Sequence, residues 1–220
     1  MKASQRAYTS LLEEILGGSL APGTMMSEVE HSERLGISRT PFREALALLY
    51  SDGLVTKPSG RGVYVTSLSV ESISKLYAVR RALEECAARL AARNADPAVF
   101  QGLAHSFHSA HATLTDNAES IDAYYLLNRH FDQAIDTAVE NDYLVAALTN
   151  IRMHSQRARN IARSNIERLR ASAEETRCIC HAIAEKDAEL AAHATHIHLH
   201  HSLAHVLSTV SSDVTPESRS

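Results

Sequence analysis

The chain has 220 residues, 45% of them hydrophobic and 5% aromatic, which allows one large or two modest domains and favours helices over sheet. The formal net charge of −4 argues against a protein that coats nucleic acid non-specifically, and no apolar run approaches the roughly 20 residues that span a bilayer. Three cysteines form no disulfide framework and the first residues are not a signal peptide, so we expect a cytoplasmic protein without a membrane partner.

The first predicted elements form a helix-turn-helix. A helix is expected over residues 4–16, and a short second helix over 27–35 ends at Gly36, which can adopt the left-handed conformation that closes a helix. Ser38 then caps a third helix, with Pro41 in its first turn, where a missing N–H costs nothing. Two helices joined by so tight a turn are typical of a helix-turn-helix.

Basic side chains mark the start of the third helix. Arg39 and Arg43 are four residues apart, so both project from one side of its first two turns. A recognition helix contacts base edges and phosphates with this part, so the pattern predicts DNA binding. The alternative is a solvated helix face, in which Arg43 pairs with Glu44 or Glu33.

Two short β-rich runs follow the third helix. Residues 54–56 and 63–66 flank a Gly-rich turn, which predicts a hairpin. A hairpin directly after a recognition helix is a wing. We expect Gly60 and Arg61 at its tip to approach the minor groove or the DNA backbone.

The second half shows only helical patterns, with six helices expected to begin near residues 69, 96, 120, 141, 172 and 187. Ser172 with Glu175 predicts a capping box for the fifth helix. The fourth continues through an arginine cluster, interpreted as a charged helix face: Arg152, Arg157, Arg159, Arg163, Arg168 and Arg170.

The predicted fold class is mostly α. We expect a winged helix-turn-helix domain over 1–67, an all-α helical bundle of about six helices over 68–210, and a disordered tail over 211–220.

The motif GISRTPFREAL at 36–46, followed by DGLV at 52–55 and GRG at 60–62, resembles the winged helix-turn-helix of GntR-family bacterial transcription regulators. LYAVRRALE at 76–84 and NRHFD at 128–132 resemble the FadR-type (FCD) effector domain of that family. The resemblance implies a homodimeric repressor that binds a palindromic double-stranded DNA operator and releases it when a small carboxylate effector binds. It assigns DNA contacts to Arg34, Ser38, Arg39, Thr40, Arg43, Gly60 and Arg61.

The resemblance also implies a metal site between helices. Many FCD domains use an Asp or Asn, a His one turn later, and one His from each of the last two helices. These positions here are Asn128, Asp132, Thr176 and His198. One divalent ion (Zn, Ni or Mn) held by Asn128, Asp132 and His198 is one expectation. Because two histidines are replaced, the alternative is a hydrogen-bonded polar pocket without metal.

Arg80 is the predicted anchor for the effector. It lies on the apolar stripe of its helix, where a solvated arginine would be out of place, and an inward guanidinium offers a fork to a carboxylate. The alternative is an intrahelical pair with Glu84. The other predicted effector contacts are Tyr77, Asn128, Thr176 and His201, the last of which shares a helix side with His198.

Two other classes of protein remain as alternatives. A metal-dependent enzyme would be built on Asp132 and His198, but the sequence holds no nucleophile–base pair and no metal motif with intact spacing. A metal sensor acting through protein partners would not need Arg39 and Arg43. We therefore expect a regulator and not an enzyme.

Overall fold

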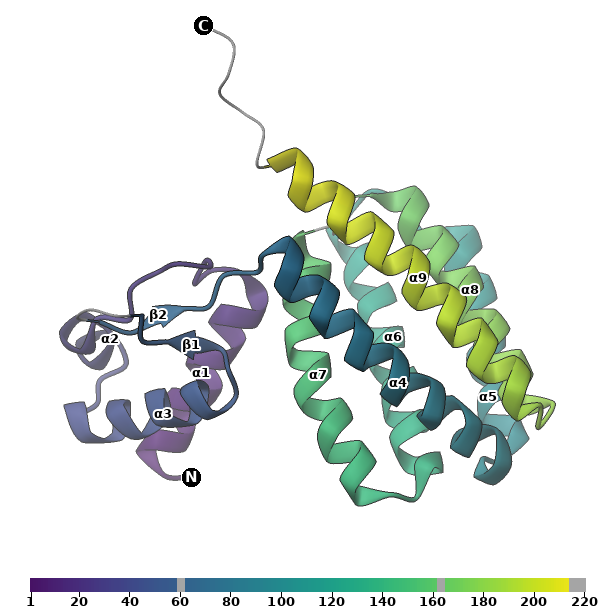
Figure 1. The fold of residues 1–220 in the computed structure, drawn as a ribbon, viewed down its shortest axis with the longest axis horizontal. Helices are drawn as coiled ribbons and strands as arrows, with labels where there is room; N and C mark the ends of the chain where they lie inside the picture. The colour runs from purple at the N-terminus through teal and green to yellow at the C-terminus, as the bar shows by residue number, and fades with distance from the viewer. Residues whose placement is uncertain (59–61, 162–164, 214–220) are drawn as a thin grey trace, which may run out of the picture. The chain divides into compact units, whose positions relative to one another are not determined.

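The structure is a computed structural model that describes residues 1–58, 62–161 and 165–213 (Figure 1). These residues divide into two compact units. The first unit contains Met1–Ser69 and also Met153–Asn160, and the second contains the other described residues from Val70 onward. No pattern in the sequence predicted that Met153–Asn160 belongs with the N-terminal part of the chain.

The first unit is a winged helix-turn-helix. Its helices and strands are α1 (Ala3–Gly17), α2 (Glu28–Arg34), α3 (Arg39–Ser51), β1 (Val55–Thr56) and β2 (Tyr64–Val65). Ser27 caps α2 by accepting a hydrogen bond from the N–H of Glu30, and Gly36 has a φ of +63° in the turn before α3. The two strands are antiparallel, with Val55 opposite Val65.

The core of the first unit follows the helical spacing of its apolar residues. Phe42, Ala45 and Leu49 of α3 are fully buried and form one cluster with Leu11 and Ile15 of α1. Because the buried stripe of α3 faces α1 and the hairpin, the opposite side of α3 is left exposed.

The second unit is an all-helical bundle. Its helices are α4 (Val70–Asn94), α5 (Pro97–Thr113), α6 (Ala118–Val139), α7 (Asp142–Ile161), α8 (Ile166–Ala184) and α9 (Ala188–Asp213). Within the described residues no strand follows β2. The predicted fold class, a winged helix-turn-helix followed by a helical bundle, is confirmed. None of the described helices combines the length and apolar character needed to cross a membrane.

One predicted helix boundary in the bundle is wrong. The helix predicted to begin at Ser172 begins at Ile166, because Asn165 caps it by accepting from the N–H of Arg168 at 2.9 Å. Ser172 instead accepts a hydrogen bond from the Tyr124 hydroxyl at 2.8 Å. The last helix, expected to run to about residue 210, is α9 and ends at Asp213. Residues 214–220 of the predicted tail lie outside the described residues.

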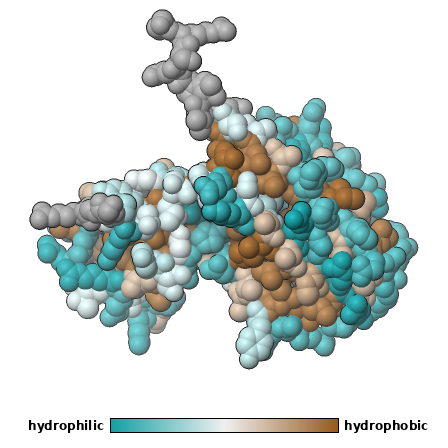
Figure 2. Space-filling model, viewed as in Figure 1, coloured by the Kyte–Doolittle hydropathy of each residue, from teal (hydrophilic) through white to brown (hydrophobic). Residues whose placement is uncertain are grey.

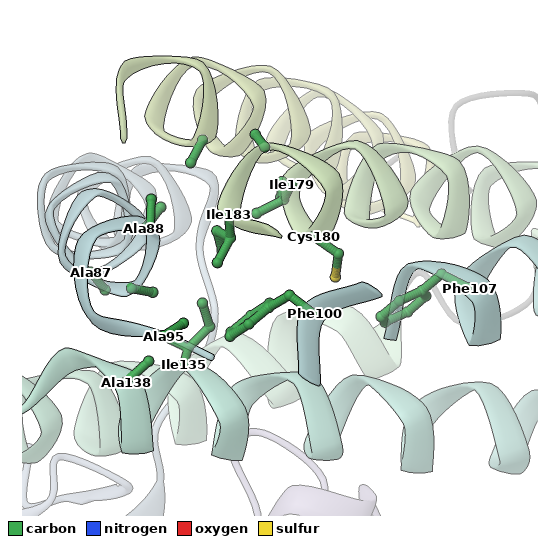
Figure 3. Close-up of a cluster of buried hydrophobic side chains, with 14 of the residues drawn as sticks. Ala87, Ala88, Ala95, Phe100, Phe107, Ile135, Ala138, Ile179, Cys180 and Ile183 are labelled. Atoms are coloured by element: carbon green, nitrogen blue, oxygen red, sulfur yellow. The ribbon is translucent and has the colours of Figure 1, made fainter. Parts of the chain in front are cut away.

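Large and small side chains alternate in the core of the bundle (Figure 3). Phe100 and Phe107 of α5 are fully buried, and Ile183 packs in the same cluster. Ala87 and Ala88 give α4 a small-residue face that lets neighbouring helices approach closely. Truncating either phenylalanine to alanine would cost about 3–5 kcal/mol. This core holds α4, α6, α7, α8 and α9 in the positions from which their polar side chains meet.

Candidate DNA-binding and effector sites

The exposed side of α3 presents the residues expected to contact DNA. Arg39 and Arg43 keep 64% and 69% of their side chains exposed, and Ser38 and Thr40 are exposed beside them. Ser38 occupies the N-cap position without making a capping hydrogen bond, so its hydroxyl is not committed to the helix. The N-terminal end of a helix attracts anions, and here it carries two largely exposed arginines as well. This surface is suited to a phosphate backbone and base edges.

Glu28 draws both arginines of α3 toward α2. Arg43 donates from Nε to Glu28 Oε2 at 3.0 Å, and Arg39 Nε lies 4.0 Å from Glu28 Oε1. The pairing of Arg43 with Glu44 or Glu33, considered from the sequence, is therefore not the one that forms. Glu28 was missed because it lies 15 residues before Arg43, beyond helical spacing.

Arg34 is committed inside the first unit. Both of its terminal nitrogens donate to Glu14 at 2.8 Å, and Nη2 lies 3.2 Å from Nδ1 of the buried His31. The hydrogen bond to Glu14 is the main reason that the pKa of Arg34 is raised. Its guanidinium links α2 to α1 and already has two partners. The contact between Arg34 and DNA stays a prediction.

A groove of about 550 Å³ lies between α3 and the hairpin. Its apolar floor includes Leu46, Ala47 and Val63, and the cations Arg43 and Lys57 stand among its lining residues. The predicted wing-tip contacts, Gly60 and Arg61, lie outside the described residues.

The C-terminal part of α7 completes the first unit. His154 Nε2 lies 2.9 Å from the backbone oxygen of Asp52, where α3 ends, and Arg157 donates to the hydroxyl of Thr66 at 2.8 Å and to its carbonyl. Asn160 donates to the carbonyl of Leu16 at the end of α1. Burial lowers the pKa of Arg157. The interpretation of the arginine cluster as a charged helix face is therefore wrong for Arg157, and it is also wrong for Arg152 and Arg168, whose side chains are only 16% and 15% exposed. Arg163 lies outside the described residues.

In the second unit Arg80 is buried as predicted. Its side chain is 5% exposed, its Nε donates to Glu84 Oε1 at 2.8 Å, and its guanidinium carbon lies 4.6 Å from the ring centre of Tyr77. Burial lowers the pKa of Arg80, but the charge and hydrogen bond of Glu84, together with Tyr77 and the charge of Asp132, outweigh burial and raise the pKa above the usual value. Arg80 therefore points inward and also pairs with Glu84, so the two alternatives predicted for this residue occur together. Arg80 Nη1 is buried without a hydrogen-bond partner.

Glu175 is the central carboxylate on the α8 side of this interior. It accepts from Nδ1 of His198 at 3.0 Å and of His201 at 2.8 Å, and from Arg168 at 2.8 and 2.6 Å. Burial raises its pKa, but the hydrogen bonds from His198 and Arg168 outweigh burial and lower the pKa to about 2. This role of Glu175 was not predicted, because Ser172 and Glu175 match a capping box that would place Glu175 in the first turn of a helix.

The expected metal ligands are engaged elsewhere. Asp132 Oδ1 lies 3.3 Å from Arg152 Nε, Asn128 donates to the carbonyl of Tyr124 at 3.0 Å, and the hydroxyl of the buried Thr176 donates to the carbonyl of Ser172 at 2.9 Å. Among the described residues no three His, Cys, Asp or Glu side chains form a group that could hold a metal ion. The predicted metal is therefore not confirmed.

Charge also opposes a metal ion at this position. Like charges about 4 Å apart cost ~4 kcal/mol at an effective dielectric constant of 20, and ~8 kcal/mol when one of them is divalent. A divalent ion on Asp132 would have to displace the guanidinium of Arg152. The contact of His198 with Glu175 is compatible with either state, because carboxylates also orient metal-bound histidines. The pairing of Asp132 therefore decides that these residues do not fit a metal as they stand.

Comparisons with known proteins agree with this architecture. Residues 3–65 match the family model "Bacterial regulatory proteins, gntR family", and residues 75–201 match the FCD domain. A probable D-xylose utilization operon transcriptional repressor of Paenarthrobacter nicotinovorans is 30% identical over 92% of this chain and 87% of its own. The HTH-type transcriptional repressor RspR of Escherichia coli is 28% identical over 71% of this chain and 68% of its own.

The solved structure of McbR/YncC from E. coli has the same fold, with a TM-score of 0.76 over 96% of this chain and 99% of that one at 22% identity. The two curated relatives are named as transcriptional repressors, and none of these comparisons supports the enzyme alternative. The two family models together span most of the sequence. The chain therefore belongs to the GntR family of bacterial transcription regulators and carries an FCD domain behind its winged helix-turn-helix.

Proposed function

We propose that the protein is a homodimeric repressor that releases palindromic operator DNA when a small carboxylic acid binds beside Arg80. The single observation that carries the effector assignment is the buried Nη1 of Arg80 without a partner. An unmet hydrogen bond on a buried group costs about 1–3 kcal/mol, and more when the group is charged. A carboxylate would satisfy this donor with the planar geometry that a guanidinium prefers.

The DNA contacts are proposed for Ser38, Arg39, Thr40 and Arg43. All four are exposed at the start of α3, and the two arginines add charge to the anion-attracting end of that helix. Bidentate contacts from arginine to guanine are the commonest specific contacts in the major groove. The pattern fits a recognition helix that enters the groove with its first two turns.

A homodimer is proposed because a palindrome needs two recognition helices. Val79 of α4 and Leu190 and Ile197 of α9 are about half exposed, and hydrophobic surface is visible along α4 and over the C-terminal part of α9 (Figure 2). An exposed apolar face of this kind is suited to a second copy of the chain. Light scattering that gives the mass of a single chain at micromolar concentration would contradict the dimer.

The proposed release follows from the half-site spacing. Two recognition helices must lie about 34–36 Å apart to contact successive turns of DNA on one face. An effector can change this spacing only by binding one arrangement of the dimer more tightly than the other. A carboxylate paired with Arg80 would bind more tightly to a dimer arrangement that encloses Arg80 than to one that opens the interior around it.

The test begins with operator sequences selected from a random duplex library. Mono-, di- and hydroxycarboxylates are then screened for those that raise the melting temperature of the protein and release the selected duplex. Arg80→Lys keeps a charge for Glu84 but removes the planar fork, so it should bind DNA like wild type and lose the response. Arg81→Lys, the same change at the exposed neighbouring residue, is the control. A normal acid response in Arg80→Lys would remove Arg80 from the effector site.

A further inference from the structure

We propose that the guanidinium of Arg152 takes the place of the divalent metal ion that the family resemblance implies, so that the polar interior of the helical unit is closed by arginine and works without metal. The inference deepens the proposed function, because it concerns the interior in which we place the effector. Its test needs neither the effector nor DNA.

Arg152 bridges two carboxylates of α6. Its Nε lies 3.3 Å from Asp132 Oδ1, and its Nη1 lies 2.7 Å from both carboxylate oxygens of Asp136. Asp132 and Asp136 are one helical turn apart, so a single guanidinium from α7 reaches both. These contacts join α6 to α7 in the way that a bridging cation would.

The charge of Arg152 is permanent and enclosed. Its side chain is only 16% exposed, and the carboxylates of Asp132 and Asp136 together with the charge of Glu84 keep its pKa above the usual value although burial lowers it. A guanidinium cannot lose its proton in this setting. The cluster therefore contains its own cation at every physiological pH, with Arg80 as a second cation beside Glu84.

The remaining expected ligands are arranged for hydrogen bonds. Asn128 and Thr176 each donate to a backbone carbonyl of their own helix, and His198 lies against Glu175. A threonine at a ligand position suits a protein that does not need the metal, because its hydroxyl is a poor ligand for zinc or nickel. Asp132 and Thr176 stand where the family resemblance implies histidines. Together with Arg152 they favour an interior that works without metal.

One consequence concerns the ligand. A metal in this interior would favour acids that offer a second donor atom for chelation, whereas an arginine fork is satisfied by the carboxylate alone. The effector class is therefore a carboxylic acid recognised directly by guanidinium, without a requirement for a neighbouring hydroxyl group.

The first measurement is the metal content of the untagged full-length protein, purified without chelator and analysed by elemental mass spectrometry. We expect far less than one ion per chain. Addition of zinc, manganese or nickel chloride, or of a chelator, should leave the melting temperature unchanged. About one ion per chain, with a melting temperature that falls on chelation, would overturn the proposal.

Variants of Arg152 provide the second measurement. Arg152→Met removes the cation and leaves the carboxylates of Asp132 and Asp136 without it, so its melting temperature should fall by about 10 °C and should be partly restored by manganese or zinc chloride. Arg152→Lys restores a cation, so its melting temperature should fall less and should not respond to metal. Arg177→Met, which breaks a pair with Glu174 on the surface of α8, is the control and should show no metal response.

Each result of these variants decides the proposal. Equal melting temperatures for Arg152→Met and Arg177→Met would show that Arg152 is not the cation that closes the cluster. If Arg152→Met does not fold, the metal content of wild type and of Arg152→Lys still decides, because metal in either contradicts the inference. A failed carboxylate screen would count against the proposed function and leave the metal measurement unaffected.

Discussion

The two units use arginine in opposite ways. In the winged helix-turn-helix, Arg39 and Arg43 are largely exposed and share one carboxylate, Glu28. In the helical bundle, Arg80 is buried and pairs with Glu84, and Arg152 is only 16% exposed and pairs with Asp132 and Asp136. Exposed pairs contribute little to stability, whereas breaking a buried pair leaves a costly charge behind.

This difference predicts that arginine substitutions in the two units affect different quantities, DNA binding in one and stability in the other. The proposed DNA contacts would cost the arginines of α3 only an exposed ion pair with Glu28, so their substitution should weaken binding and leave folding intact. The charges of the bundle interior are part of the packed structure, so their substitution should affect folding first.

The largest effect is expected for Glu175→Gln, because it leaves Arg168 and His198 without their shared carboxylate. The free energy of unfolding should fall by about 3–5 kcal/mol in chemical denaturation. Glu174→Gln, one residue away on the surface and paired with Arg177, is the matched control and should cost less than about 1 kcal/mol. Equal losses in the two variants would contradict the contrast.

The same residue predicts a pH dependence. The pKa of Glu175 is lowered from 4.5 to about 2, so its contribution to stability is complete above pH 4.5 and is lost as the pH falls toward 2. The shift corresponds to about 3 kcal/mol. The difference in unfolding free energy between wild type and Glu175→Gln should narrow over that interval, and a constant difference would refute the assigned pairing.

The next effect concerns DNA. Arg39→Ala and Arg43→Ala should each weaken binding to the selected operator by about 1–3 kcal/mol, or about 5- to 150-fold, with unchanged melting temperatures. Arg129→Ala removes an equal charge from an exposed position on α6 and serves as the control for net charge. Wild-type affinity in both α3 variants, measured by fluorescence anisotropy, would refute their assignment.

A smaller effect is expected for Tyr8→Phe. The Tyr8 hydroxyl donates to Asp52 at 2.7 Å, and burial together with this bond raises its pKa from 10.0 to about 12. The variant should lose about 1 kcal/mol at neutral pH. In wild type this stabilisation is present below pH 10 and is lost as the pH rises toward 12. Tyr143→Phe, at a fully exposed position, should change neither quantity.

The smallest effect is expected for Glu28→Gln, which frees Arg39 and Arg43 from their shared carboxylate. Affinity for any duplex should rise by up to about fivefold, because an exposed ion pair is worth less than about 1 kcal/mol. Glu33→Gln, an exposed change of equal charge on α2, is the control. If Glu28→Gln binds more weakly than wild type, Glu28 positions the arginines and does not merely compete with DNA.

Local signals in the sequence predicted most of the fold. The turn at Gly36, the cap at Ser38 and the two short strands all appear where the motifs placed them. The inward position of Arg80 was also predictable, because it lies on the apolar stripe of a long amphipathic helix.

The partners of the charged residues were not predictable. Glu175 meets His198 across 23 residues, and Arg152 meets Asp136 across 16, so neither contact follows from spacing within one helix. The start of α8 was missed because Asn165 is an unremarkable N-cap in an arginine-rich stretch, whereas Ser172 and Glu175 match a capping box by chance. The partners of these charged residues are determined by tertiary contacts, which local sequence patterns do not predict.

The eight residues Met153–Asn160 have a consequence for how this family can recombine its parts. They lie in the middle of the sequence that matches the FCD domain, yet their partners are the end of α1, the end of α3 and Thr66. A chimera that exchanges effector domains at residue 69 would replace these donors and leave Asp52, Thr66 and Leu16 without them. A chimera keeps the winged helix-turn-helix unit complete only if it also keeps residues 153–160.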